Sequence, residues 1–246
     1  MIQQIGRFIK HALVILGTTL GCAVLVDDPG TDGDPAGMLL CTPMLDRWVR
    51  VMPAMVGTPS LEWILGITGL RREDLDAVLA QTAPGAGGVV VLPYLAPAGE
   101  RAPFVDPYAR GQVLGLSLES TREDLVRAVC EGIAYAVRDC LEAAGLGPDG
   151  RVFLGGGGVR SVGWRQILAD VLQRPLLLGR QPEPGARGAA LAAMQAAGMP
   201  VDETAWTRPE GVVEPRAEYA SLYDAGFAFY RERTQAARGN WRGPAG

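Results

Sequence analysis

Four consecutive glycines, Gly155 to Gly158, stand between a short apolar run and a helical pattern. The run Val152–Leu154 has the composition of a buried strand. Ser161 can cap a helix whose apolar residues recur at helical spacing: Trp164, Ile167, Leu168, Val171 and Leu172. A glycine turn between a strand and a helix presents backbone N–H groups with no Cβ in the way, and the helix dipole favours an anion. This stretch therefore predicts the binding of a phosphate or a nucleotide.

A second candidate lies near the N-terminus, where the apolar runs Ala12–Leu16 and Leu20–Val26 flank Gly17-Thr18-Thr19. The pattern predicts two strands joined by a tight hairpin. Such a tip can offer backbone N–H groups and hydroxyls to terminal phosphates. A purely structural interpretation stays open at both places, with Gly17 as a turn residue, Thr18 as a β-former and the four glycines as a crowded turn.

Other site chemistries find little support. The glycines do not form G-x-G-x-x-G followed by an acid about 20 residues on, and Asp170 falls inside the next helix, so a nicotinamide-dependent oxidoreductase lacks its fingerprint. No P-loop motif is present. The chain has one histidine, His11, which argues against a Ser-His-Asp triad or a histidine-rich metal site. Its widely spaced cysteines predict neither a zinc site nor a disulfide framework: Cys22, Cys41, Cys130 and Cys140.

Composition narrows the class of protein. The chain has 246 residues, 48% of them hydrophobic, and a formal net charge of −4 without a basic run, so a nucleic-acid partner is not expected. The basic start MIQQIGRFIKH and the apolar ALVILGTTLGCAVLV resemble a signal peptide, with Cys22 in a crude lipoprotein position. However, Gly17-Thr18-Thr19 interrupts the apolar run and no Ala-x-Ala site follows. We therefore expect a cytoplasmic protein without a membrane segment.

Strands and helices alternate along the chain, which predicts an α/β fold. A helix of small residues after Glu183-Pro184-Gly185 is expected to lie very close to neighbouring backbone or ligand. Ser120-Thr121-Arg122-Glu123 has the form of a capping box. The long segment 93–111 is expected to be a packed, functional loop. Further strands are predicted at Met38–Thr42, Trp48–Met52, Val89–Leu92, Val113–Leu118 and Leu176–Leu178, and further helices at Ser60–Ile67, Arg72–Gln81 and Arg216–Arg238.

Six segments, in order, resemble motifs of the FGGY carbohydrate kinases, which belong to the actin-like ATPase superfamily. GGGGVRSVGWRQILADVLQRP resembles the adenosine-side motif, and ALVILGTT resembles the second phosphate hairpin. The other four are GTPSLEWI, LPYLAPAGERAPFVDPYARG, STREDLVRAVCEGIAYAVRD and EPGARGAALAAMQAAG. Together they cover about Ala12 to Gly198, and the resemblance implies a ribonuclease H-like lobe with a mixed sheet flanked by helices.

The resemblance also implies an activity: ATP-dependent phosphorylation of a sugar or polyol hydroxyl, with Mg²⁺ as the metal. It places Thr18 and Thr19 at the terminal phosphates. It places the glycine turn (Gly156, Gly157, Gly158) and Ser161 near the ribose, α-phosphate and adenine, and Gly57 and Glu62 near the nucleotide. Glu100, Arg101 and Asp106 are expected to brace the long loop or its turns. Ser161 stands where the family often has Asn.

The chain departs from the family in one important respect. Members of the family are about twice as long, and their catalytic Asp precedes the phosphate hairpin, where this chain has MIQQIGRFIKH and no acidic residue before Asp27. We therefore expect a leader at 1–11, the C-terminal nucleotide lobe at 12–238 and a tail at 239–246, with no catalytic residue of its own. The lobe should bind ATP or ADP, should act on a sugar (xylulose or a related pentulose) only with an N-terminal lobe, and should self-associate through an exposed apolar face. A non-catalytic nucleotide-binding or interaction module is the alternative.

Overall fold

The computed structural model describes residues 11–30, 37–42, 47–179, 184–202, 205–206 and 208–241. The expected leader lies outside this part of the chain except for His11, and the domain boundaries stay a prediction. No helix in the described residues is long and apolar enough to cross a membrane.

Seven strands of the described residues form a mixed sheet in the order β3-β4-β2-β1-β7-β8-β9. The central strands β1, β7 and β8 are parallel, whereas β2, β4, β3 and β9 join them through antiparallel pairs. The bounds are β1 His11–Leu16, β2 Leu20–Val26, β3 Met38–Cys41, β4 Trp48–Ala54, β7 Arg151–Gly155, β8 Leu176–Leu178 and β9 Gly211–Val213. The structure thus has the mixed sheet flanked by helices that the α/β interpretation predicted.

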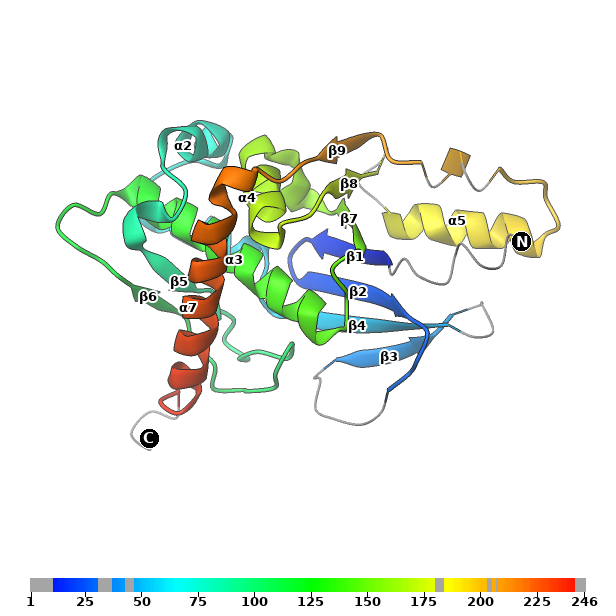
Figure 1. Ribbon diagram of the computed structural model, residues 1–246, viewed down its shortest axis with the longest axis horizontal. Helices are drawn as coiled ribbons and strands as arrows, with labels where there is room; N and C mark the ends of the chain where they lie inside the picture. Colours follow the sequence, from blue (N-terminus) through cyan, green and yellow to red (C-terminus); the bar gives the residue numbers. More distant parts are fainter. Residues whose placement is uncertain are drawn as a thin grey trace.

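Helices cover the two faces of this sheet unequally (Figure 1). Figure 1 shows α3 and α7 on one side of the strands and α5 on the other. A separate two-stranded sheet, β5 Val90–Leu92 with β6 Gln112–Leu114, packs against α3 and α7. The helices are α1 Thr58–Thr68, α2 Leu75–Gln81, α3 Arg122–Ala143, α4 Val162–Leu172, α5 Pro184–Ala196 and α7 Ala220–Arg238.

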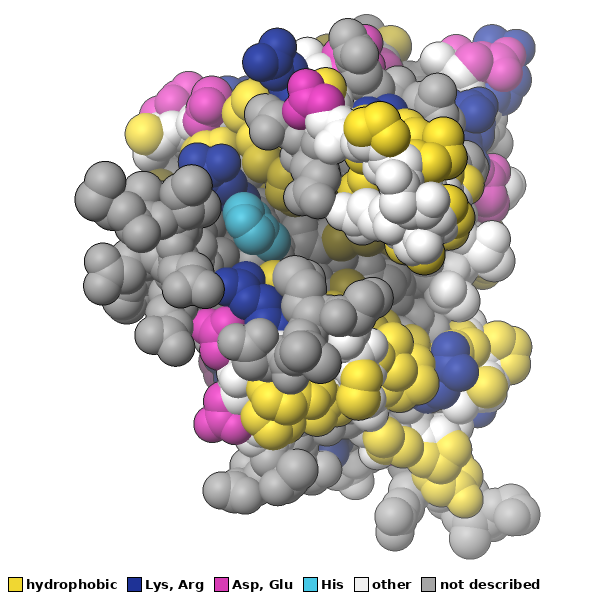
Figure 2. Space-filling model, turned by 90° about the vertical axis from the view of Figure 1, so that its right-hand side faces the viewer, with side chains coloured by type: hydrophobic (Ala, Val, Ile, Leu, Met, Phe, Trp, Pro, Cys, Tyr) yellow, Lys and Arg dark blue, Asp and Glu magenta, His cyan; other side chains and the backbone are white. Residues whose placement is uncertain are grey.

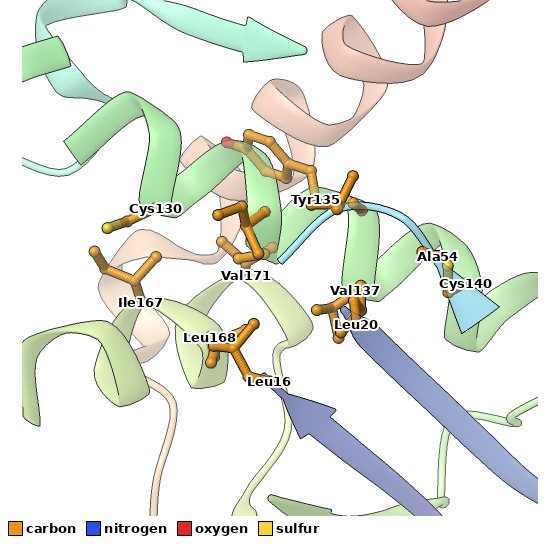
Figure 3. Packing of buried hydrophobic residues seen from close by; sticks show 14 of the residues in the cluster. Leu16, Leu20, Ala54, Cys130, Tyr135, Val137, Cys140, Ile167, Leu168 and Val171 are labelled. Carbon is orange, nitrogen blue, oxygen red and sulfur yellow. The ribbon is translucent and has the colours of Figure 1, made fainter. Parts of the chain in front are cut away.

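The core lies between the sheet and the helices α3 and α4. Alternate residues of β1 point into it, and Val14 and Leu16 are at most 1% exposed. Figure 3 shows Leu16 beside Leu168 of α4, and Leu20 beside Val137 of α3. Each buried side chain of this size contributes about 1.5–3 kcal/mol relative to exposure, so this face supplies most of the stability.

An ion pair is buried among these helices. Arg127 and Glu131 of α3 are 2% and 3% exposed, and the Arg127 Nε donates to Glu131 Oε1 at 2.8 Å. Arg127 Nη1 also donates to the Leu79 carbonyl, and Glu131 accepts from the Gly85 N–H and the Tyr223 hydroxyl. The network therefore ties α3 to the end of α2, to the following turn and to α7.

The small-residue helix α5 does not lie close to the backbone of the sheet, so the expected close approach to backbone is not made there, while a close approach to a ligand stays a prediction. An apolar cavity of about 490 Å³ separates α5 from the sheet, and a Cβ added at Gly188 would meet no atom within 4 Å. Small side chains permit a close approach but supply little apolar area to drive it. We call this space the open-face groove; its lining includes Leu13, Leu25, Phe153, Arg187, Leu191 and Trp206. Figure 2 shows this face of the molecule, hollowed beside the single histidine.

Two predicted boundaries were wrong. The strand expected at Val113–Leu118 ends at Leu114, because the chain turns at Gly115 (φ +78°), and Leu118 is fully exposed. The capping box is shifted by one residue from the predicted position. Thr121 caps α3, with Asp124 as its reciprocal partner, because the Asp124 carboxylate accepts from both the N–H and the hydroxyl of Thr121.

The long loop 93–111 is packed, as predicted, and its anchor is the C-terminal helix. The hydroxyl oxygens of Tyr94 and Tyr230 are 2.6 Å apart. Phe104 stacks on Trp241 with ring centroids 5.7 Å apart, and the Arg238 guanidinium lies 4.6 Å from the centre of the Phe104 ring. The loop is therefore held by residues at the far end of the chain.

Candidate functional site

The hairpin tip between β1 and β2 is open to solvent at both threonines. Gly17 N–H donates to the Thr19 carbonyl at 3.3 Å, and Thr18 and Thr19 are exposed. Within the described residues, the N–H groups of Thr18 and Thr19 have no hydrogen-bond partner. The tip thus has two free amide donors and two hydroxyls, which are the groups that an anion needs.

The start of α1 holds this tip in place. Thr58 N–H donates to the Gly17 carbonyl at 2.8 Å, and Leu20 N–H donates to the Val56 carbonyl at 2.7 Å. A Cβ at Gly57 would lie 2.5 Å from the Thr18 carbonyl oxygen, so only glycine fits there. Gly57 is therefore a neighbour of the hairpin and acts by allowing close backbone contact, while its place near the nucleotide stays a prediction.

The glycine turn lies beside the same hairpin. Ile15 of β1 is in register with Gly155 of β7, and a Cβ at Gly156 (φ +93°) would lie 2.6 Å from the Leu16 carbonyl oxygen. Gly157 differs, because an added Cβ there would meet no atom within 4 Å. Gly156 is thus required by the fold, whereas Gly157 faces open space at the site.

That open space belongs to a pocket of about 200 Å³. The residues that line it come from the turn before α2, from α2, from the glycine turn and from the start of α4: Arg72, Glu73, Leu75, Asp76, Gly157, Gly158, Arg160, Ser161 and Trp164. Glu62 of α1 does not line the pocket, but it forms an ion pair with Arg72, which does line it. The structure therefore brings Gly157, Gly158 and Ser161 together at one pocket, whereas Glu62 only contacts one of the lining residues, Arg72.

The N-terminus of α4 is already occupied by groups of this chain. Ser161 is the N-cap, as predicted, and its hydroxyl accepts from the Trp164 N–H at 3.1 Å. Sequence reasoning missed Asp76, whose carboxylate accepts from the Ser161 hydroxyl at 2.5 Å and from the amides of Gly163 and Val162 at 2.9 and 3.3 Å. These three amides are therefore engaged within the chain, and the binding of an anion at the glycine turn stays a prediction.

The pKa of Asp76 follows from these contacts. Partial burial would raise the pKa of this carboxyl, but the hydrogen bonds from Ser161, Gly163 and Val162 outweigh burial and hold it below its ordinary value. Asp76 is therefore a carboxylate at neutral pH. The sequence signal for it was weak, because Asp76 is one acidic residue on a polar helix and its partner Ser161 stands 85 positions away.

Glu100 braces the long loop, as expected, by tying it to the residue that follows β4. Its side chain is 1% exposed, and Oε1 accepts from the Met55 N–H at 2.6 Å and the Arg101 N–H at 2.8 Å. Burial raises the pKa of this carboxyl, although the backbone hydrogen bonds act against it. Asp106 is a turn residue, since its carboxylate accepts from the Tyr108 N–H and its backbone pairs with that of Glu100.

His11 lies away from this site. It begins β1, whereas the hairpin tip follows the last residue of β1, a distance of roughly 17 Å at the usual rise of a strand. Burial and the charges of Arg151 and Arg47 lower its pKa. Within the described residues, no three His, Cys, Asp or Glu side chains are grouped so that they could hold a metal ion.

The sequence profile described as "FGGY family of carbohydrate kinases, C-terminal domain" matches residues 12–197. The chain belongs to this family. The match begins at the first strand of the sheet and ends just after α5, so it spans both the hairpin and the glycine turn. The family resemblance drawn from the motifs is thereby confirmed.

Curated relatives in this family are sugar and polyol kinases. The chain is 30% identical over 207 residues to a gluconokinase of Bacillus subtilis, covering 75% of this chain and 38% of that protein. It is 32% identical over 235 residues to an erythritol kinase of Brucella abortus, covering 88% and 45%. The chain thus spans less than half the length of these relatives.

Solved FGGY kinases have the same fold. A xylulose kinase from Lactobacillus acidophilus superimposes with a TM-score of 0.86 at 24% identity, over 94% of this chain and 48% of that one. A kinase from Brucella ovis gives a TM-score of 0.80 at 30% identity, over 93% and 49%. These likenesses confirm the actin-like ATPase fold. The nucleotide contacts assigned to Thr18, Thr19, Gly57, Glu62, Gly156, Gly157, Gly158 and Ser161 stay a prediction.

Proposed function

We propose that this chain is the nucleotide-binding half of an ATP-dependent kinase that phosphorylates a hydroxyl of a sugar or polyol, with xylulose or a related pentulose as the first candidate. One observation carries the proposal. The free amides of Thr18 and Thr19 follow Leu16, which lies against the glycine turn of the pocket that Gly157 leaves open, and both features lie within the part of the chain that matches the kinase family.

The chemistry divides between this chain and the rest of such a kinase. ATP, bound with Mg²⁺, supplies the phosphoryl group. The amides and hydroxyls of the hairpin tip would hold the terminal phosphates by donating hydrogen bonds, which positions them and stabilises negative charge. Gly157 and Gly158 would let the nucleoside lie against the backbone.

A general base for the sugar hydroxyl is not available at this pocket. Among the described residues that line it, the only carboxylates are Glu73 and Asp76; Glu73 pairs with Arg71, and Asp76 is engaged by the start of α4. A positioned base contributes about 10²–10⁴-fold to the rate. We therefore propose that the chain alone is inactive and that an N-terminal half supplies the base and most of the sugar pocket.

Calorimetry with Mg-ADP tests nucleotide binding. Because only one half of the cleft is present, we expect a dissociation constant in the high-micromolar to millimolar range, about −4 to −6 kcal/mol. Gly157→Val should abolish binding without unfolding the chain, since its side chain enters open space. Gly147→Val is the matched control, because Gly147 also has no neighbour within 4 Å of an added Cβ but does not line the pocket. Absence of ADP binding by the unaltered chain would contradict the proposal.

A coupled assay tests the inactivity of the isolated chain. With ATP and a panel of ketopentoses, aldopentoses, glycerol and erythritol, turnover should stay near background. Addition of the N-terminal half of a family member should raise it. Robust turnover by the chain alone would show that it carries its own base, whereas ADP binding that no N-terminal half converts into turnover would favour a non-catalytic module.

A further inference from the structure

The contacts of Asp76 account for most, but not all, of its hydrogen-bonding capacity. A carboxylate has about four acceptor positions, two on each oxygen. Oδ1 accepts from the Ser161 hydroxyl and the Gly163 amide, whereas Oδ2 accepts only from the Val162 amide, at 3.3 Å. One position on Oδ2 therefore remains, on a side chain that lines the pocket beside Gly157.

The same contacts determine which part of a nucleotide the pocket can accept. A free helix N-terminus attracts phosphate through its N–H groups and its dipole. In α4, however, Val162, Gly163 and Trp164 already donate to Asp76 and Ser161, so these amides are not available to a second anion. A phosphate therefore finds no free backbone donor at the start of α4, while the hairpin tip has free amides and no acidic side chain of its own.

The pocket offers an acceptor, Asp76, to a group that donates hydrogen bonds, and its lining also contains Arg72, Glu73 and Arg160. Its volume of about 200 Å³ has Leu75 and Trp164 in its lining and backbone at Gly157 and Gly158, with Asp76 as an acceptor. Small-molecule sites commonly combine apolar walls with a few polar groups that fix orientation. A nucleoside offers two kinds of donor to a carboxylate, the exocyclic amino group of adenine and the ribose hydroxyls.

We propose that Asp76 is a specificity-determining residue of the nucleotide site, which accepts a hydrogen bond from a donor group of the nucleoside and occupies the α4 amides that would otherwise bind phosphate. This inference rests on the proposed function, because it assumes that the pocket takes a nucleotide. It predicts the orientation of that nucleotide, with the nucleoside at Asp76 and the phosphates at Thr18 and Thr19.

Binding of three diphosphates to the unaltered chain gives the first test. Inosine diphosphate has a carbonyl in place of the adenine amino group, and 2′-deoxy-ADP lacks one ribose hydroxyl. The analogue that lacks the donor read by Asp76 should bind about tenfold more weakly than ADP, because a charged acceptor loses its partner. Equal affinity for all three would overturn the inference while leaving the proposed function intact. Failure of ADP itself to bind would instead overturn the proposed function.

Asp76→Asn gives the second test, and its readout is selectivity rather than affinity. The amide keeps the shape but loses the charge, so the preference for ADP over the discriminated analogue should shrink to near unity. Binding of inorganic pyrophosphate should become stronger, because the α4 amides are then less strongly occupied. Thermal unfolding checks that the variant is folded, since the substitution also weakens the cap of α4.

Asp74→Asn is the matched control. Asp74 lies two residues earlier, pairs with Arg71 and does not line the pocket. The substitution therefore removes the same charge without changing a residue of the site. Selectivity should be unchanged in this variant. Retention of full selectivity by Asp76→Asn, or an equal loss in Asp74→Asn, would show that Asp76 does not read the nucleoside.

Discussion

The two faces of the seven-stranded sheet are built from the same strands, yet helices cover one face much more completely than the other. Val14 is 1% exposed under the helices, whereas its neighbour Ile15 on the other face is 38% exposed. The first face is closed by α3 and α4, and the second carries the apolar open-face groove of about 490 Å³ beneath α5. The comparison teaches that this chain encloses one complete core, while its other face retains apolar surface. Substitutions on the two faces should therefore differ greatly in cost.

The largest effect is expected from the buried ion pair on the covered side. Arg127→Met leaves Glu131 buried without its cation, which should lower the free energy of unfolding by about 3–5 kcal/mol. Urea unfolding measures this loss. Arg122→Met on the same helix breaks an exposed pair with Glu123 and should cost under about 1 kcal/mol. Similar losses in the two variants would contradict the picture of a closed core.

A large-to-small change in the core comes next. Leu168 of α4 is 1% exposed and packs under the sheet, so Leu168→Ala should cost about 2–5 kcal/mol through lost burial and the cavity that remains. Leu191→Ala on α5 is the counterpart on the other side, since Leu191 lines the groove and is only partly buried. Leu191→Ala should therefore lower the free energy of unfolding by less than Leu168→Ala. Equal losses in chemical denaturation would show that α5 packs tightly against the sheet.

Asp139 of α3 should give a smaller, pH-dependent effect. Burial raises the pKa of Asp139 from 3.8 to about 6, partly offset by Arg231. Because the folded state holds the proton more tightly, stability is greatest below pH 4 and is lost as pH rises through 6. Asp139→Asn should therefore stabilise the chain at pH 8 by about 1–3 kcal/mol, with the gap closing at pH 4. Thermal melts of both proteins across this range check the sign, and a gap that widens toward low pH would refute it.

The smallest effect on stability is expected at the groove. Leu191→Ser should change the free energy of unfolding by about 0.5 kcal/mol or less. We propose that the chain self-associates through this face, so the same variant should weaken both self-association and the binding of an apolar dye. Sedimentation and dye fluorescence measure these, with Leu118→Ser as a control at an exposed leucine outside the groove. A clean monomer that binds no dye would remove the basis for this proposal.

Local sequence pattern was sufficient for most elements and for part of the site. Alternation and glycine punctuation located β1, β2 and β7, and the helical spacing from Trp164 to Leu172 located α4. The family motifs then predicted that the hairpin and the glycine turn belong to one nucleotide site. Two kinds of feature were not predicted correctly. One is the choice between adjacent residues for the same role, such as Ser120 or Thr121 as the helix cap, and the other is a contact between residues far apart in the sequence, such as Asp76 with Ser161. The open-face groove depends on packing area, which periodicity does not measure.

The anchoring of the long loop also bears on how the chain folds as it is made. Tyr94 meets Tyr230, which stands 136 positions later, and Phe104 meets Trp241 near the C-terminus. During synthesis from the N-terminus, strands β1 to β4, helix α3 and strand β7 leave the ribosome well before these partners do. The loop that carries Glu100, and through it the strand end beside the phosphate hairpin, therefore acquires its final packing only after Tyr230 and Trp241 have been synthesised.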